Sequence, residues 1–408
     1  MTTELLTVKL EKLTYGGDAL GHLSDGRAVF VPFALPGETV SIRILDEKPG
    51  HVRAELIEVL IPSPERITPK CVHFGVCGGC HYQHLPYPGQ LIAKTDILRD
   101  QALRIGKIKN PSVMPAVPST PEWNYRNHIQ FHLTRGGKLG YIDAHSRGIL
   151  PITECHLPDP SLDSIWPRLE FDPSLTLERV SLRLGLDQQV MLVLESPDAP
   201  ELELEADLSV VHLSGDDVVV MAGDDYLTMK VNDRLFHVSA ASFFQVNTGM
   251  AEKMVAHLLE QLPVTPAATL LDVYSGVGLF SAFFASQVAR VIGIESSPSA
   301  SADFEINLDE FDNVELYEAP AEEVLPALDV KPDVVIVDPP RAGLDKRALD
   351  ALVHLAPQRI AYVSCDPSTL ARDAARLISA GFRLLQVTPF DLFPQTYHIE
   401  SISIFEKS

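Results

Sequence analysis

The stretch LLDVYSGVG, residues 270–278, decides the fold of the C-terminal part of this chain. A short apolar run that ends in a glycine-rich turn is typical of a buried strand leading into a helix. Similar runs at residues 291–294, 334–337 and 360–363 alternate with helical stretches. This alternation predicts an α/β unit, with a parallel sheet covered on both faces, from about residue 241 onward. In such a sheet, ligands bind at the carboxyl ends of the strands.

The first polar motif follows the strand predicted at 270–273. Gly276 and Gly278 let the backbone approach a nucleotide-like ligand, and Glu295, at the tip of the next strand, is placed to accept hydrogen bonds from a ribose. A dinucleotide fingerprint would have Gly or Ala at the position of Ser281, which disfavours NAD. A tight turn beside a solvated acid is the simpler alternative.

The second motif is Asp338-Pro339-Pro340-Arg341, at the end of the strand predicted at 334–337. Two consecutive prolines end a strand and hold the preceding aspartate at the sheet edge. A plain strand-terminating turn explains the same residues. In the predicted sheet, however, Asp338 faces the same crevice as the glycine-rich turn.

Two further candidates lie near the C-terminus. Cys365 follows the strand predicted at 360–363, and Asp366-Pro367 can begin a helix whose positive end favours a thiolate. A free cysteine is more often a small buried apolar residue, so its neighbours matter. Glu400, before the predicted strand 402–405, would act as a general base if it lay beside Cys365.

The other four cysteines are spaced like ligands of one metal centre. Cys71, Cys77 and Cys80 form a C-x5-C-x2-C array, and Cys155 is distant in sequence. Five cysteines are an odd number and do not form a disulfide framework, whereas this spacing indicates metal or redox chemistry. Thiolates in this pattern suit Zn²⁺ as well as an iron–sulfur cluster. Three nearby histidines add to the possible ligands: His73, His81 and His84.

The distribution of apolar runs, turns and prolines along the sequence divides the chain into three predicted units. Residues 1–61 alternate short apolar strands with glycine turns and predict a small β-barrel. The proline-rich stretch at 61–64 predicts a linker. Residues 62–240 contain the four cysteines, a helical segment at 89–105 and strands at 128–133 and 189–194, which indicates a mixed α+β domain. Residues 241–408 form the third, α/β unit.

The net charge of −22 is unevenly distributed along the 408 residues. Residues 66–147 carry eleven Lys or Arg against four Asp or Glu, whereas residues 159–227 carry three against sixteen. A local basic face can bind phosphates on an acidic protein, because salt screens distant charges. The start of the chain has no leader-like pattern, and no apolar run approaches the roughly 20 residues of a membrane span, so we expect a cytoplasmic protein.

Taken together and in order, these motifs resemble the S-adenosylmethionine-dependent RNA 5-methyluridine (uracil-C5) methyltransferases, in particular the 23S ribosomal RNA type. The resemblance extends over essentially the whole chain. It includes residues 13–36, which are similar to the family's TRAM domain, and the stretch at 244–247, Phe-Gln-Val-Asn. It implies a Rossmann-like class I methyltransferase domain, an N-terminal OB-type barrel and a central iron–sulfur domain.

The resemblance also assigns roles to residues. Cys365 matches the nucleophile, and Glu400 matches the base. The cofactor-binding positions correspond to Gln245, Tyr274, Glu295 and Asp338. The ligands of a [4Fe-4S] cluster correspond to Cys71, Cys77, Cys80 and Cys155. One departure is Asp366, which stands where asparagine is frequent.

The implied partner is RNA, with 23S ribosomal RNA favoured and transfer RNA as the alternative, and no membrane or obligate protein partner is indicated. Basic residues between 99 and 138 are candidates for phosphate contacts, and Trp123, Tyr125 and His128 are candidates for stacking on bases. Two other classes stay open. One is a non-catalytic RNA-binding assembly factor, and the other is a redox enzyme that uses the cluster with a dinucleotide.

Overall fold

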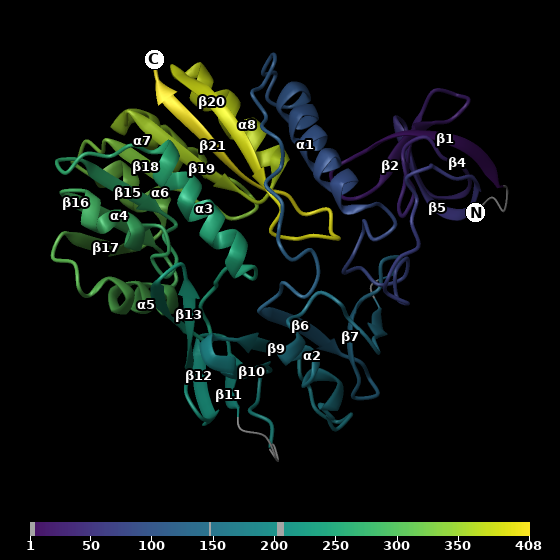
Figure 1. The fold of residues 1–408 in the computed structure, drawn as a ribbon, viewed down its shortest axis with the longest axis horizontal. Coiled ribbons are helices and arrows are strands. Elements are labelled where there is room, and N and C mark those ends of the chain that lie inside the picture. Colours follow the sequence, from purple (N-terminus) through teal and green to yellow (C-terminus); the bar gives the residue numbers. More distant parts are fainter. Residues whose placement is uncertain (1–4, 147, 202–207) are drawn as a thin grey trace.

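The computed structural model describes residues 5–146, 148–201 and 208–408. The first four residues, part of the start without a leader-like pattern, lie outside these ranges. An N-terminal barrel and a large C-terminal sheet lie on opposite sides of the molecule, with helix α1 (Tyr87–Arg104) between them and a second sheet adjoining both (Figure 1). No helix in the described ranges combines the length and apolar character needed to cross a membrane.

The barrel is closed, with strand order β1-β2-β3-β5-β4. Its alternate side chains, such as Val8, Val29 and Ile42, fill the interior, as the period of two predicts. Apolar runs at residues 7–10, 28–32 and 38–44 predict the first, third and fourth strands, whereas the second and fifth were not identified from the sequence. The strands are β1 (Leu6–Leu13), β2 (Ala19–His22), β3 (Ala28–Val31), β4 (Thr39–Lys48) and β5 (His51–Ile61).

The middle sheet has the order β12-β11-β10-β9-β6-β7-β8, and its pairs are antiparallel except for β10 with β11. Phe131, Trp166 and Leu182 lie in its core. The short helix α2 (Pro160–Asp163) lies beside it. Its strands are β6 (His128–Leu133), β7 (Leu139–Ile142), β8 (Ile149–Pro151), β9 (Arg179–Leu184), β10 (Val190–Glu195), β11 (Ser209–Ser214) and β12 (Asp217–Ala222).

The C-terminal sheet has the order β17-β16-β15-β18-β19-β21-β20, and β21 runs antiparallel to both of its neighbours. The predicted parallel strands correspond to β15, β16, β18 and β19. Strands β17 and β20 were not identified from the sequence. The bounds are β15 (Thr269–Val273), β16 (Arg290–Glu295), β17 (Val314–Glu318), β18 (Val334–Val337), β19 (Arg359–Ser364), β20 (Phe382–Phe390) and β21 (Glu400–Lys407).

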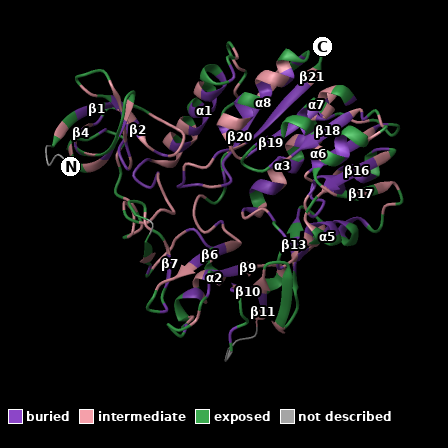
Figure 2. Ribbon diagram, turned by 180° about the vertical axis from the view of Figure 1, so that it is seen from behind, coloured by how far each residue is buried: buried purple, intermediate pink, exposed green. Residues whose placement is uncertain are grey.

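Helices cover both faces of this sheet, and its central strands are buried (Figure 2). Leu270 packs with α3 and α5 on one face, whereas Leu271 packs with α1, α7 and α8 on the other. Near-continuous apolar strands are the result of burial on both sides. The helices are α3 (Thr248–Gln261), α4 (Ser281–Phe284), α5 (Pro298–Leu308), α6 (Ala321–Val324), α7 (Lys346–Leu355) and α8 (Pro367–Ser379).

Two elements from residues 62–240 pack against the C-terminal sheet. Ile97 and Leu98 of α1 belong to the core beneath α8. The hairpin of β13 (Tyr226–Val231) and β14 (Arg234–Ser239) packs on α5, where Ser239 N donates to Asp303 Oδ2 at 2.9 Å. The domain boundary predicted at residue 240 therefore falls between β14 and α3, two elements that share one hydrophobic core.

Candidate functional site

Five of the predicted site residues lie in a row along the carboxyl edge of the parallel strands. Each occupies the end of a different neighbouring strand, and the strands follow in the order β16, β15, β18, β19 and β21. Neighbouring strands lie about 4.8 Å apart, so the row brings distant parts of the sequence together. In strand order its residues are Glu295, Tyr274, Asp338, Cys365 and Glu400.

The glycine-rich turn after β15 is held in a conformation that favours glycine. Tyr274, Gly276 and Gly278 all have positive φ values, of 63°, 55° and 86°. A Cβ atom on Gly278 would lie 2.9 Å from the Phe304 ring, so the loop packs closely on α5. Glu295 stabilises the same loop, because its carboxylate accepts a hydrogen bond from Gly276 N at 2.9 Å. It also accepts hydrogen bonds from the amides of Ser296 and Ser297, which follow β16.

Asp272 is a site residue that the sequence analysis did not select. Its Oδ2 accepts hydrogen bonds from the Ser281 amide at 3.1 Å and hydroxyl at 2.7 Å. Ser281, the departure from a dinucleotide fingerprint, is thus a partner for this aspartate. Burial raises the pKa of Asp272 to about 6, and the Oδ1 atom has no hydrogen-bond partner among the described residues. The sequence signal for Asp272 was an acidic residue inside an otherwise apolar strand.

Gln245 lies in the loop that leads into α3. Asn247 caps this helix by accepting a hydrogen bond from Met250 N, and its Nδ2 donates to Ser119 Oγ at 2.9 Å. The main-chain oxygen of Gln245 accepts a hydrogen bond from Asn127 at 3.0 Å. Within the described residues the Gln245 side chain makes no hydrogen bond to the row along the sheet edge.

Cys365 and Glu400 are neighbours across an antiparallel pair of strands. Ser364 of β19 pairs with Ser401 of β21. Cys365, which follows Ser364, and Glu400, which precedes Ser401, therefore lie at the same edge of the sheet. Burial raises the pKa of Cys365 to about 12, with further contributions from Glu400 and Asp338, and Arg341 opposes them. Burial and then Asp338 also raise the pKa of Glu400 well above its usual value. The pKa of Asp338 itself is raised to about 7, by burial and by Asp272.

The turn that carries Cys365 leads into α8 as predicted. The Asp366 carboxylate accepts hydrogen bonds from Ser368 N at 2.8 Å and Thr369 N at 3.0 Å, which caps the helix. The thiol is therefore close to the positive end of a long helix, although burial and acidic neighbours outweigh this effect on its pKa. Aspartate serves as the cap here, in place of the asparagine that is frequent in the family.

The four remaining cysteines lie around a single cavity of about 210 Å³. Arg126, Tyr141 and His398 also line it, and His398 is two residues before Glu400. Among the described residues, no three His, Cys, Asp or Glu side chains are close enough together to hold a single metal ion. Of the three nearby histidines, His73 lines the cavity and its Nε2 lies 3.1 Å from Thr153 Oγ1.

The structure contradicts one candidate for base stacking. Tyr125 is buried, and its hydroxyl donates to Pro394 O at 3.0 Å, so its ring faces the protein interior. Arg99 and Arg104 are exposed on α1 and form ion pairs with Asp96 and Asp100 of the same helix. Helix α1 contacts the loop between β20 and β21 through Lys94, a packing that was not evident from the sequence (Figure 1).

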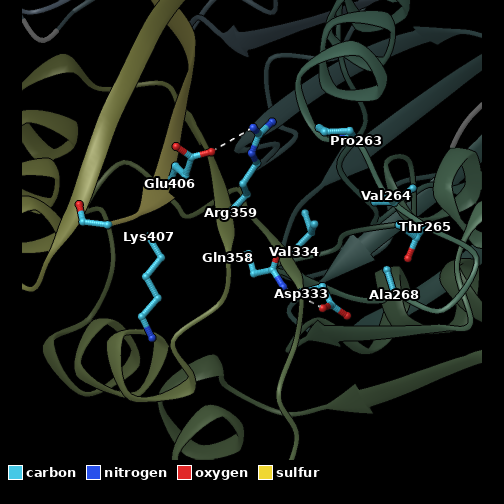
Figure 3. A pocket seen from close by; sticks show the side chains of 11 residues that line it. Pro263, Val264, Thr265, Ala268, Asp333, Val334, Gln358, Arg359, Glu406 and Lys407 are labelled. Atoms are coloured by element: carbon cyan, nitrogen blue, oxygen red, sulfur yellow. Dashed lines mark hydrogen bonds and ion pairs between the residues drawn. The ribbon is translucent and has the colours of Figure 1, made fainter.

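A larger hollow of about 570 Å³ lies at the opposite edge of the sheet (Figure 3). It is lined by residues at the amino ends of the parallel strands, including Asp333 and Gln358, and contains the ion pair between Arg359 and Glu406. None of the predicted site residues lies there. The candidate site is therefore at the carboxyl edge, where parallel sheets bind ligands.

Comparisons with known proteins identify the family of this chain. A family model described as tRNA (Uracil-5-)-methyltransferase matches residues 201–408, and a TRAM domain model matches residues 1–57. An uncharacterized RNA methyltransferase of Thermosynechococcus vestitus is 33% identical, with 99% of this chain and 98% of the relative covered. One from Caldanaerobacter subterraneus subsp. tengcongensis is 34% identical, with 99% and 98% covered.

Among solved structures, the tRNA (uracil-54, C5)-methyltransferase of Pyrococcus abyssi in complex with S-adenosyl-L-homocysteine is similar over the whole fold. The TM-score is 0.74 at 25% sequence identity, with 98% of this chain and 100% of that chain covered. The two proteins thus share one overall fold. This chain belongs to the RNA (uracil-5-)-methyltransferase family and is an S-adenosylmethionine-dependent enzyme.

Proposed function

We propose that this enzyme methylates carbon 5 of a uridine in 23S ribosomal RNA through a covalent adduct with Cys365. The observation that carries the proposal is the position of Cys365 opposite Glu400 across β19 and β21, beside Asp338. A nucleophile and a base at adjacent strand ends can act on two neighbouring atoms of one ring.

The chemistry requires both side chains. Carbon 5 of uracil is a poor nucleophile, so the Cys365 thiolate adds to carbon 6 and gives an enolate. Carbon 5 then attacks the sulfonium methyl group, and the departing product is S-adenosylhomocysteine. Glu400 removes the proton from carbon 5, after which the carbon 6–sulfur bond breaks and the thiolate is released. Burial raises the pKa of Glu400, which makes its carboxylate a stronger base for this proton.

The cofactor residues extend from this centre along the sheet edge. Tyr274 and Glu295 border the glycine-rich turn, where Glu295 has the position expected of a ribose-binding acid. Asp338 lies between this turn and Cys365, which supports its assignment to the cationic sulfonium. We assign Gln245, in the loop before α3, to the cofactor as well. S-adenosylhomocysteine in the similar Pyrococcus abyssi enzyme supports a site of this kind.

The target base must leave its stack before Cys365 can reach carbon 6. A thiolate adds from above or below the ring, and these faces are covered while the base remains stacked. Uridines in loops or bulges are extruded at lower cost. We therefore assign the substrate to an unpaired region of RNA.

We also propose that Cys71, Cys77, Cys80 and Cys155 hold a [4Fe-4S] cluster. Four thiols around one cavity of about 210 Å³ form a donor set suited to a cluster of several atoms. When bound, the cluster would join the cysteine-rich loop, residues 71–81, to the segment around Cys155. No catalytic step passes through the cluster. Anaerobic purification should give brown protein with about four irons and four sulfides per chain. Colourless protein with one equivalent of zinc would overturn this assignment.

Transfer RNA is the second candidate substrate. It is favoured by the Pyrococcus abyssi enzyme, whose name specifies uridine 54 of tRNA and whose chain is covered completely. The deciding experiment maps 5-methyluridine in both RNA classes from a strain that lacks this gene. Loss of a modification in 23S RNA alone supports the proposal. Loss in transfer RNA alone, or in neither class, overturns it.

A further inference from the structure

One turn of the N-terminal barrel reaches the catalytic centre. Residues 14–18 join β1 to β2, and Thr14 N donates to Asp18 O at 2.9 Å to close the turn. Gly16 and Gly17 have φ values of 106° and 93°, which favour glycine. The residue between Thr14 and Gly16, Tyr15, packs with the core of the C-terminal sheet, although the barrel has a core of its own.

The Tyr15 hydroxyl contacts the main chain at Cys365, the proposed nucleophile. It donates a hydrogen bond to the main-chain oxygen of Cys365 at 3.4 Å, across 350 residues of sequence. The neighbouring Asp366 carboxylate caps α8, so the Cys365 turn is held from the helix side and from the barrel side. Burial, followed by Asp366, raises the pKa of Tyr15 strongly, which keeps the hydroxyl protonated as a donor.

The Tyr15 ring contacts the segment that leads to Glu400. Its edge meets the ring of Tyr397 at a centroid distance of 5.8 Å, and Tyr397 packs on His398 at 4.3 Å. The same turn touches the cysteine-rich loop, because a Cβ atom on Gly17 would lie 3.1 Å from His81. His81 meets Tyr397 at 4.6 Å. The barrel turn thus packs against both chain segments that carry the reacting side chains.

We propose that Tyr15 is a positioning residue for the methyl transfer, holding the Cys365 turn through its hydroxyl and the segment before Glu400 through its ring. The barrel then completes the catalytic centre, in addition to any contact that it makes with RNA. This inference rests on the proposed function, in which Cys365 is the nucleophile. A tyrosine that served only to dock the barrel would need its ring and not its hydroxyl.

The test compares Tyr15→Phe with the wild type in single-turnover capture of RNA. The probes are transcripts of 23S ribosomal RNA and of transfer RNA with 5-fluorouridine in place of uridine. Fluorine on carbon 5 cannot be removed as a proton, so the covalent adduct persists after methyl transfer. We expect Tyr15→Phe to form the adduct about three- to ten-fold more slowly, the loss that one hydrogen bond accounts for. Dissociation constants for RNA and S-adenosylmethionine should stay within about two-fold.

Lys12→Ala is the matched control. It removes the exposed ion pair between the barrel and Asp100 of α1, at 2.8 Å, and leaves the Tyr15 hydroxyl in place. We expect adduct formation at the wild-type rate. Equal rates for Tyr15→Phe and wild type, a loss confined to RNA affinity, or an equal loss in Lys12→Ala would overturn the inference. Cys365→Ala separates the two proposals, since an adduct in that variant would refute the nucleophile itself.

Discussion

Lys94 Nζ lies 2.5 Å from Asp391 Oδ1, and both residues are buried, each only 1% exposed. The pair joins α1 to the loop that follows β20 and leads to Glu400. Lys94 also donates to Phe393 O at 3.0 Å. Burial lowers the pKa of Lys94, and Asp391 acts in the opposite direction to keep it charged.

Lys94→Met should destabilise the protein by about 3–5 kcal/mol, because it leaves the Asp391 carboxylate buried without its counter-ion. Urea denaturation measures this loss. Lys12→Ala removes an exposed pair from the other side of α1 and should cost less than about 1 kcal/mol. Equal costs for the two variants would show that the buried pair does not secure α1.

Glu400→Gln should accumulate a methylated covalent RNA adduct, because the thiolate cannot leave until carbon 5 has lost its proton. A denaturing gel with labelled cofactor detects the adduct. Glu406→Gln on the same strand is the control, since Glu406 pairs with Arg359 and Arg383 at the opposite end of β21. Full turnover by Glu400→Gln without any adduct would exclude Glu400 as the base.

The reactivity of Cys365 should report the charges around it. With a pKa of about 12, alkylation by iodoacetamide should rise about ten-fold per pH unit between pH 7 and 9. Glu400→Gln removes a charge that raises this pKa, so alkylation should be faster at pH 9. Arg341→Gln removes a charge that lowers it, so alkylation should be slower. Mass spectrometry of the Cys365 peptide separates this thiol from the other four, and changes of the opposite sign would contradict the geometry.

Affinity for S-adenosylmethionine should increase with pH up to about 7, the pKa of Asp338, and level off above it. The sign follows because a sulfonium cation binds the ionised carboxylate more strongly than the neutral acid, by about ten-fold. Calorimetry from pH 5.5 to 8.5 measures it. S-adenosylhomocysteine, which lacks the sulfonium charge, is the matched ligand and should show little change, and Asp338→Asn should remove the dependence. Equal pH profiles for the two ligands would contradict a contact between Asp338 and the sulfonium.

The sequence predicted most of the C-terminal sheet because burial on both faces requires apolar runs, and such runs are visible without an alignment. The same argument placed Tyr274, Asp338 and Cys365 at strand ends. The prediction that Tyr125 stacks on bases was wrong, because an aromatic residue in a basic segment has the same sequence pattern whether its ring faces solvent or the interior. The roles of Gln245 and Tyr274 came from the family resemblance, and periodicity alone did not supply them.

The sequence by itself determined which segments become strands and which residues follow them, because these properties depend on neighbouring residues. Only the tertiary structure decided which strand ends meet. The insertion of β21 between β19 and β20 brings Glu400 opposite Cys365. The contacts of Lys94 with Asp391 and of Tyr15 with Cys365 join residues 297 and 350 positions apart. Such pairs arise from the packing of whole elements, which no local pattern records.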